Sequence, residues 1–162
     1  MSADNSLSHL DADGRPTMVD VTNKTVTERT ATAHTSVFLP DSVIAALLND
    51  AGELVSKKGS VFSTASIAGV MAAKRTHELI PFCHPLGLTG CDVDLTLDEN
   101  VVSISATCRV VHKTGVEMEA LTAATVAALT VYDMCKACSH DIEIRETHLV
   151  SKTGGKRDFR RE

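Results

Sequence analysis

The most informative stretch of the chain is Lys113-Thr-Gly-Val-Glu-Met-Glu-Ala-Leu-Thr-Ala-Ala-Thr-Val-Ala-Ala-Leu-Thr-Val-Tyr-Asp-Met-Cys-Lys136, most of which has the pattern of one long helix. The interior of this stretch is small and apolar, whereas Glu117 and Glu119 stand near its start and Asp133 and Lys136 near its finish. Charged groups withdrawn from water cost free energy unless they are paired or hydrogen-bonded. We therefore expect a largely buried helix whose two ends need either salt-bridge partners or a ligand.

The sequence on either side alternates between strand and helix patterns. Apolar residues at every second position predict strands, and apolar residues three and four apart predict helices. Strands interleaved with helices favour an α+β fold, a ferredoxin-like sandwich in which an antiparallel sheet carries its helices on one face. The expected elements are one or two strands over 18–39 with a bend at 23–24, a helix over 43–48, a loop at 57–60, a helix over 61–79, a hairpin of 92–97 and 101–111, the long helix over 116–137 and a strand over 142–150.

The chain has the length of a single domain. Its 162 residues are enough to bury a core without disulfides or a metal. Residues 1–17 are polar and contain turn residues, so we expect a flexible N-terminal segment. Residues 18–152 are expected to form one α+β domain, and residues 153–162 a mobile basic tail.

Composition favours a soluble, cytoplasmic protein. No apolar run approaches the roughly 18 residues that cross a membrane, and the N-terminus does not resemble a signal peptide. The chain has five cysteines, an odd number that argues against a disulfide framework. Reduced thiols are the expectation.

The net charge of −5 disfavours general nucleic-acid binding, but the basic residues are clustered. Cations recur in pairs at 57–58, 74–75 and 156–157, with Lys152 nearby. Paired cations in an acidic chain suit a small polyanion such as a nucleotide phosphate. Ordinary solvated surface lysines remain the alternative for any single pair.

The two charged ends of the long helix are far apart. Glu119 and Asp133 are separated by fourteen residues, which is about 21 Å at the rise of an α-helix. Asp133 and Lys136 are close enough to share one pocket. Either the ligand is long, or each site borrows residues from a neighbouring subunit. A carboxylate pair favoured by the helix dipole and a routine surface ion pair remain the alternative.

Two cysteine-containing motifs are further candidates. Phe82-Cys83-His84 lies between two prolines, which hold a thiol and an imidazole in a rigid, non-helical segment. A structural histidine is the alternative there. Cys135 and Cys138 with His140 allow a metal or redox interpretation, but no second ligand pair has conventional spacing, and a helix C-terminus does not acidify a thiol.

Short motifs run along nearly the whole chain. They are Met18-Val-Asp-Val21, Lys58-Gly59, Ile67-Ala-Gly69, Ala72-Ala-Lys-Arg-Thr76, Leu79-Ile-Pro81, Cys83-His-Pro-Leu86, Lys113-Thr-Gly-Val-Glu-Met-Glu-Ala-Leu-Thr122 and Tyr132-Asp-Met-Cys-Lys-Ala137. Together, from roughly residue 7 to 157, they resemble the cyclic pyranopterin monophosphate synthase family, which acts in the second committed step of molybdenum cofactor biosynthesis.

The resemblance implies a reaction and an assembly. The family converts a 3′,8-cyclised dihydroguanosine triphosphate into cyclic pyranopterin monophosphate and releases diphosphate. It has a ferredoxin-like fold and forms a homohexamer, a trimer of dimers, with the active site at the dimer interface. Such an assembly would let the two ends of the long helix serve sites completed by different subunits.

Site residues are also implied by the resemblance. The catalytic set would be Asp133, Lys136 and Lys58. The substrate-binding set would be Phe82, Cys83, His84, Glu117, Met118, Glu119, Lys74, Arg75, Lys152 and Lys156. Ser60 and Phe82 depart from the residues common in the family, outside the acid–base set. No role follows for Arg29, nor for Cys91, Cys108 and Cys138.

A mechanism can be stated as a hypothesis. Asp133 would be the general acid/base, with Lys136 and Lys58 as proton donors. His84 and Glu119 would hold the purine-derived ring and the sugar, and the other cations would stabilise the departing diphosphate.

No redox step is needed, so no cofactor is expected, and the triphosphate leaves Mg²⁺ open as its companion ion. The rivals are a non-catalytic nucleotide-binding module on the same fold and a thiol or zinc protein that uses Cys135, Cys138 and His140.

Overall fold

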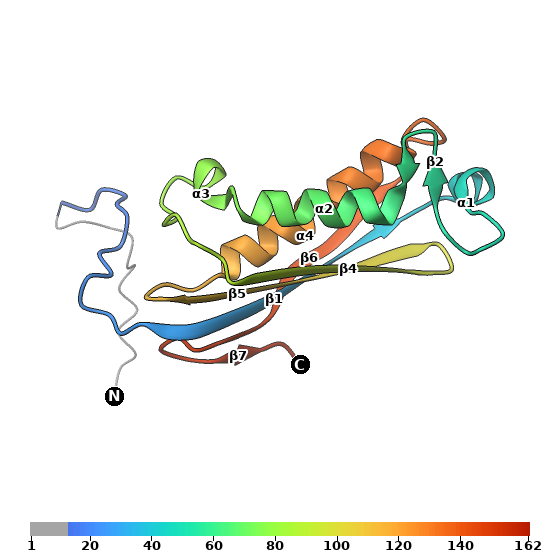
Figure 1. The fold of residues 1–162 in the computed structure, drawn as a ribbon. Coiled ribbons are helices and arrows are strands. Elements are labelled where there is room, and N and C mark those ends of the chain that lie inside the picture. The colour runs from blue at the N-terminus through green and yellow to red at the C-terminus, as the bar shows by residue number, and fades with distance from the viewer. Residues whose placement is uncertain (1–12) are drawn as a thin grey trace.

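The computed structural model describes residues 13–162 (Figure 1). Most of the predicted flexible segment 1–17 therefore lies outside the described residues. The elements in chain order are β1 (Thr27–Phe38), α1 (Asp41–Leu47), β2 (Val55–Ser56), β3 (Gly59–Ser60), α2 (Val61–Ala73), α3 (Thr76–Leu79), β4 (Gly90–Asp98), β5 (Val101–His112), α4 (Glu117–Cys135), β6 (Glu143–Thr153) and β7 (Phe159–Arg160).

One five-stranded sheet forms the base of the fold. Its strand order is β4-β5-β1-β6-β7, and each neighbouring pair is antiparallel. Helices α2 and α4 lie side by side on one face of this sheet (Figure 1). The arrangement is compatible with the ferredoxin-like α+β sandwich, so the predicted fold class is confirmed.

The core lies between the sheet and helix α4. Alternate residues of β5 from Val102 to Val110 are fully or almost fully buried, as the period of a strand with one covered face requires. Helix α4 faces them with alanines whose burial follows the helical repeat. These alanines are Ala120, Ala123, Ala124, Ala127 and Ala128.

Small residues bring α2 and α4 into close contact. Gly69 of α2 lies so near α4 that an added Cβ would stand 2.9 Å from the carbonyl oxygen of Ala123. The same Cβ would lie 3.2 Å and 3.3 Å from the two methyl groups of Val93 on β4. The absence of a side chain at this position therefore sets the spacing of the helical layer over the sheet.

The predicted helix over 61–79 is wrong in one respect, because it is broken. Helix α2 ends at Ala73, and the short α3 starts at Thr76. Arg75 between them has a φ of −114°, outside the helical range. The buried Thr76 hydroxyl donates to the carbonyl oxygen of Ala73 at 3.1 Å, a local bond that competes with continued helical pairing.

The first strand is single, which decides between the two predicted options. Residues 18–26 precede it without strand structure, and a turn lies at 22–24 near the predicted bend. The Lys24 amide donates to the carbonyl oxygen of Val21 at 3.0 Å in this turn.

The C-terminal segment contains strand structure. β7 pairs with Ser151 and Lys152 of β6 after a turn at Gly154. Gly154 has a φ of +80°, and a Cβ there would collide with the carbonyl oxygen of Glu28 on β1. Glycine is thus required where residues 153–156 lie against the sheet.

No helix within residues 13–162 combines the length and the apolar character that crossing a bilayer demands.

Replacing Gly69 with alanine should lower the free energy of unfolding by about 1–2 kcal/mol. Overpacking a core costs about 1–3 kcal/mol, and the better helix propensity of alanine offsets up to about 1 kcal/mol of this. Urea denaturation followed by circular dichroism measures the difference.

Gly87→Ala is the matched control, because a Cβ at Gly87 meets nothing within 4 Å. It should change stability by less than about 0.5 kcal/mol. Equal stability of the Gly69 variant and the wild type would contradict the close contact of α2 with α4.

Candidate active site

A cleft of about 780 Å³ opens at the N-terminal end of α4. Its walls come from residues 82–86, the turn at 113–116, the first turn of α4 and the end of β6. Cations outnumber acids among the described lining residues. The cations are Lys24, Arg29, Lys113, Lys152, Lys156 and Arg157, and the acids are Glu117 and Glu119. The cleft is therefore built to receive an anion.

Glu117 anchors a cation from the sheet at the start of α4. Its Oε1 accepts a hydrogen bond from Lys152 Nζ at 2.8 Å. Gly115 leaves room for this carboxylate, because a Cβ there would collide with Glu117 Oε2. The ion pair places the Lys152 ammonium group in the cleft wall.

Glu119 is the buried acid of the cleft. Only 4% of the surface of Glu119 is exposed to solvent. Burial, followed by the negative charge of Glu117, raises the pKa of Glu119 to about 7, although a hydrogen bond to its own backbone opposes the shift. A carboxyl group that titrates near neutral pH can both donate and accept a proton.

The segment Phe82–His84 forms another wall of the same cleft. The Cys83 amide donates to the carbonyl oxygen of Ile80 at 3.1 Å, and this hydrogen bond forms a turn directly after α3. Burial, and then the charge of Glu119, raises the pKa of the Cys83 thiol. The thiol therefore stays protonated near neutral pH.

A second charged cluster lies at the other end of α4. Asp133 Oδ1 is 2.7 Å from Lys136 Nζ, and Asp133 Oδ2 is 2.8 Å from Lys58 Nζ. Lys136 and then Lys58 hold the pKa of Asp133 at about 2. Asp133 conversely raises the pKa of Lys136. The cluster is half-exposed and lies outside the cleft.

The short hairpin β2–β3 presents Lys58 to this cluster. Gly59 follows it with a φ of +108°, a conformation that glycine adopts readily. The Lys58 amide donates to Ser56 Oγ at 3.1 Å and fixes the turn.

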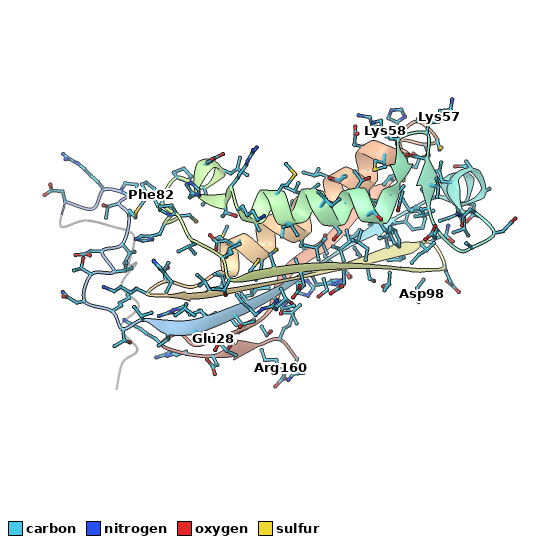
Figure 2. The ribbon with its side chains drawn as sticks, in the orientation of Figure 1. Glu28, Lys57, Lys58, Phe82, Asp98 and Arg160 are labelled. Atoms are coloured by element: carbon cyan, nitrogen blue, oxygen red, sulfur yellow. The ribbon has the colours of Figure 1, made fainter. Side chains whose placement is uncertain are left out.

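The predicted site residues thus separate into two groups. Eight of the ten predicted substrate-binding residues line the cleft, namely Phe82, Cys83, His84, Glu117, Met118, Glu119, Lys152 and Lys156. The predicted catalytic residues form the other cluster, about 21 Å away along α4. Figure 2 shows Phe82 and Lys58 at opposite ends of the helical layer.

Lys74 and Arg75 join neither group. They lie exposed at the break between α2 and α3 and are not among the lining residues of the cleft. The hydrogen bond from Cys108 lowers the pKa of the Cys91 thiol on β4, and the nearby charge of Lys74 adds to this effect.

Several cations of the cleft were missed from the sequence. Arg29 on β1 donates from Nε to the carbonyl oxygen of His112 at 3.0 Å. Lys113 donates to the carbonyl oxygen of Thr22 at 2.7 Å. The alternation along the strand does indicate the direction of Arg29. Arg29 lies an even number of residues before the buried Ala31 and Ala33, so its side chain is on the face of the sheet that the helices cover.

Within residues 13–162, no group of three His, Cys, Asp or Glu side chains is arranged to hold a metal ion. The five cysteines are free thiols.

Comparison with known proteins gives a consistent family. A family model described as the MoaC family matches residues 18–155. Proteins named cyclic pyranopterin monophosphate synthase from Xanthomonas oryzae pv. oryzae and Xanthomonas campestris pv. campestris are each 59% identical over 154 residues, covering 94% of this chain and 92% of theirs. The molybdenum cofactor biosynthesis protein 1 of Dictyostelium discoideum is 47% identical over 168 residues, covering 94% of this chain and 27% of that protein.

Glu119→Gln should change how stability depends on pH. The folded-state pKa of about 7 lies above the ordinary value of 4.5. The protonated carboxyl therefore favours the folded state below about pH 4.5, and this contribution is lost as the pH rises through 7. At about pH 8 the variant should be more stable than the wild type by on the order of 2–3 kcal/mol, with little difference near pH 4.

Urea denaturation at a series of pH values measures this difference. Glu78→Gln, at an exposed position on α3, should follow the wild-type curve. A Glu119 variant that also parallels the wild type from pH 4 to pH 8 would show that Glu119 titrates like an exposed carboxyl.

Proposed function

The chain belongs to the MoaC family, and from this premise we propose that it converts (8S)-3′,8-cyclo-7,8-dihydroguanosine 5′-triphosphate into cyclic pyranopterin monophosphate with release of diphosphate. This is a lyase reaction of molybdenum cofactor biosynthesis. The observation that carries the proposal is the cleft itself, whose lining combines several cations with the buried Glu119, a carboxyl group with a pKa of about 7.

The cleft suits such a substrate in size and charge. Its volume of about 780 Å³ falls in the range of small-molecule sites, about 300–1,000 Å³. A triphosphate carries several negative charges, which the lining cations neutralise. Lys152 is already held in the wall by Glu117. The remaining apolar surface, which includes Phe82 and Met118, is available to the ring system.

The reaction must open one ring system, build the pyranopterin, and close a cyclic phosphate while diphosphate leaves. Its early steps need proton transfers near neutral pH. We assign these transfers to Glu119, because its pKa matches the pH at which a group most effectively gives and takes protons. We give His84, which lines the same cleft, the role of hydrogen-bonding the ring.

Asp133 has a different role in this proposal. A carboxylate with a pKa of about 2 stays ionised and rarely donates a proton at neutral pH. It instead aligns Lys58 and Lys136, whose ammonium groups can deliver a proton and stabilise the charge on the leaving diphosphate. This assignment differs from the general acid/base role that the sequence analysis expects for Asp133, and that expectation stays a prediction.

A second subunit would bring the two clusters together. We propose a homohexamer, a trimer of dimers, in which Lys58, Asp133 and Lys136 of one subunit complete the cleft of its partner. The separation of about 21 Å along one rigid helix supports this, since no bend of α4 can close it. In a dimer with a two-fold axis, the C-terminal end of α4 in one subunit can lie at the N-terminal end of α4 in its partner, and the symmetry then forms the same contact a second time.

The proposed reaction also determines which cofactors and which surroundings the protein needs. No bound cofactor is required, and Mg²⁺ acts only as a companion of the substrate triphosphate. The protein works in the cytoplasm on a small molecule and needs neither a nucleic acid nor a membrane.

Asp133→Asn and Lys136→Ala should each reduce diphosphate release by at least 100-fold, because the charges that stabilise the leaving group lose their alignment. Phosphate-coupled detection of diphosphate measures the rate, and size-exclusion chromatography should show an unchanged oligomer. Asp141→Asn is the control at an exposed position outside both clusters and should leave the rate unchanged.

Near-normal turnover in either variant would refute the role given to that residue. Binding of the cyclised triphosphate by the wild-type protein without any diphosphate release would favour the non-catalytic nucleotide-binding module instead.

Mixing two inactive variants tests the shared site. A dimer of one Glu119→Gln subunit and one Asp133→Asn subunit contains one doubly damaged site and one intact site. Random assembly should therefore restore about one quarter of the wild-type rate. Co-expression with two different affinity tags provides purified mixed oligomers for the assay.

Verified mixed oligomers that stay inactive would show that both clusters act within one subunit. The proposed subunit arrangement would then be wrong, although the reaction itself would stand.

A further inference from the structure

Two cysteine thiols face each other on neighbouring strands, outside the lining of the cleft but close enough for the charge of Glu119 to act on Cys108. Cys91 of β4 and Cys108 of β5 are directly opposite in the strand register. Their sulfur atoms are 3.6 Å apart, and the Cys108 thiol donates to Cys91 Sγ. Both belong to the alternate positions of β4 and β5 that face the helices. Neither lines the cleft, so the proposed reaction gives them no task.

The two thiols differ in access and in acidity. Cys91 is partly exposed, whereas Cys108 is fully buried. The hydrogen bond from Cys108, assisted by Lys74 and Arg109, lowers the pKa of Cys91 despite the opposing effects of burial and Asp92. The same bond and burial raise the pKa of Cys108. Cys91 is therefore the thiol that forms a thiolate and meets a solute first.

The backbone places the pair at a distance that a disulfide accepts. Opposed residues in an antiparallel pair have Cα atoms about 4.5–5.5 Å apart, and disulfides span about 4.4–6.8 Å between Cα atoms. The sulfurs must approach from 3.6 Å to about 2.05 Å. Side-chain rotation supplies this change while the strands stay paired.

We propose that Cys91 and Cys108 are a redox modification site, a dithiol that a low-molecular-weight disulfide such as oxidised glutathione converts reversibly into an intramolecular disulfide. The Cys91 thiolate attacks one sulfur of the external disulfide, forms a mixed disulfide and releases one external thiolate. Cys108 then loses its proton and attacks Cys91 Sγ, which breaks the mixed disulfide and releases the second external thiolate. Both protein thiols are oxidised, and the external disulfide is reduced to two thiols that take up the two protons.

The bond would join the edge strand β4 to the interior strand β5. β4 begins at Gly90, shortly after the segment that carries Phe82 and His84 into the cleft. A cross-link here restricts the unfolded chain as well as the hairpin. The oxidised protein should therefore unfold at a higher temperature than the reduced protein.

The test uses the purified full chain and defined ratios of oxidised to reduced glutathione. After equilibration, free thiols are alkylated under denaturing conditions, and the digest is analysed by mass spectrometry. The chain has five cysteines, so oxidation should leave three of them alkylated and yield one peptide that joins Cys91 to Cys108. Dithiothreitol should reverse this, and the thermal midpoint should fall by several degrees.

Cys91→Ala and Cys138→Ala form a matched pair of variants. The Cys91 variant should keep all four remaining thiols and lose the thermal shift, whereas the Cys138 variant should keep the Cys91–Cys108 peptide. Three outcomes with the wild-type protein would overturn the proposal: five alkylated thiols at every ratio, a stable glutathione adduct on Cys91, or a bond between Cys135 and Cys138 in place of Cys91–Cys108. None of these readouts depends on the proposed enzyme activity.

Discussion

The close packing of helix α4 against α2 and the sheet is the constraint on which the rest of the structure depends. Alanines on α4 and Gly69 on α2 bring the backbones together, and no charged side chain fits between them. Charged residues of α4 are therefore confined to its two ends. Because the helix is rigid, it fixes both the place of each end and the distance between them.

The carboxyl groups at the two ends of α4 have pKa values that are shifted in opposite directions. At one end Glu119 is buried beside another carboxylate, and its pKa rises to about 7. At the other end Asp133 lies between two lysines in contact with solvent, and its pKa falls to about 2. Two carboxyl groups with such different pKa values can have different tasks. One can transfer protons near neutral pH, while the other stays ionised and positions cations. The proposed synthase reaction needs both functions.

Much of the fold could be predicted from the sequence, because its signals are local. The long helix, the hairpin and the α+β class follow from the spacing of apolar residues along continuous segments. The break at Arg75 was missed, since it depends on the burial of Thr76 and on the hydroxyl bond that this permits. The strand β7 was not predicted, because it forms by pairing with the free edge of β6, and which edge is free depends on how the whole sheet is assembled.

The site was predictable in parts. Motif residues such as His84 and Glu117 lie in one cleft, as the resemblance implied. Arg29 and Lys113 join them through hydrogen bonds to distant backbone carbonyl groups. The alternation along β1 shows which face Arg29 lies on, but no spacing in the sequence encodes these two contacts. The raised pKa of Glu119 likewise results from tertiary burial. A pH titration of carboxyl carbons by ¹³C NMR, with Glu119 and Asp133 assigned, tests the central claim most directly. The account predicts midpoints of about 7 for Glu119 and about 2 for Asp133, and two midpoints both near 4 would contradict it.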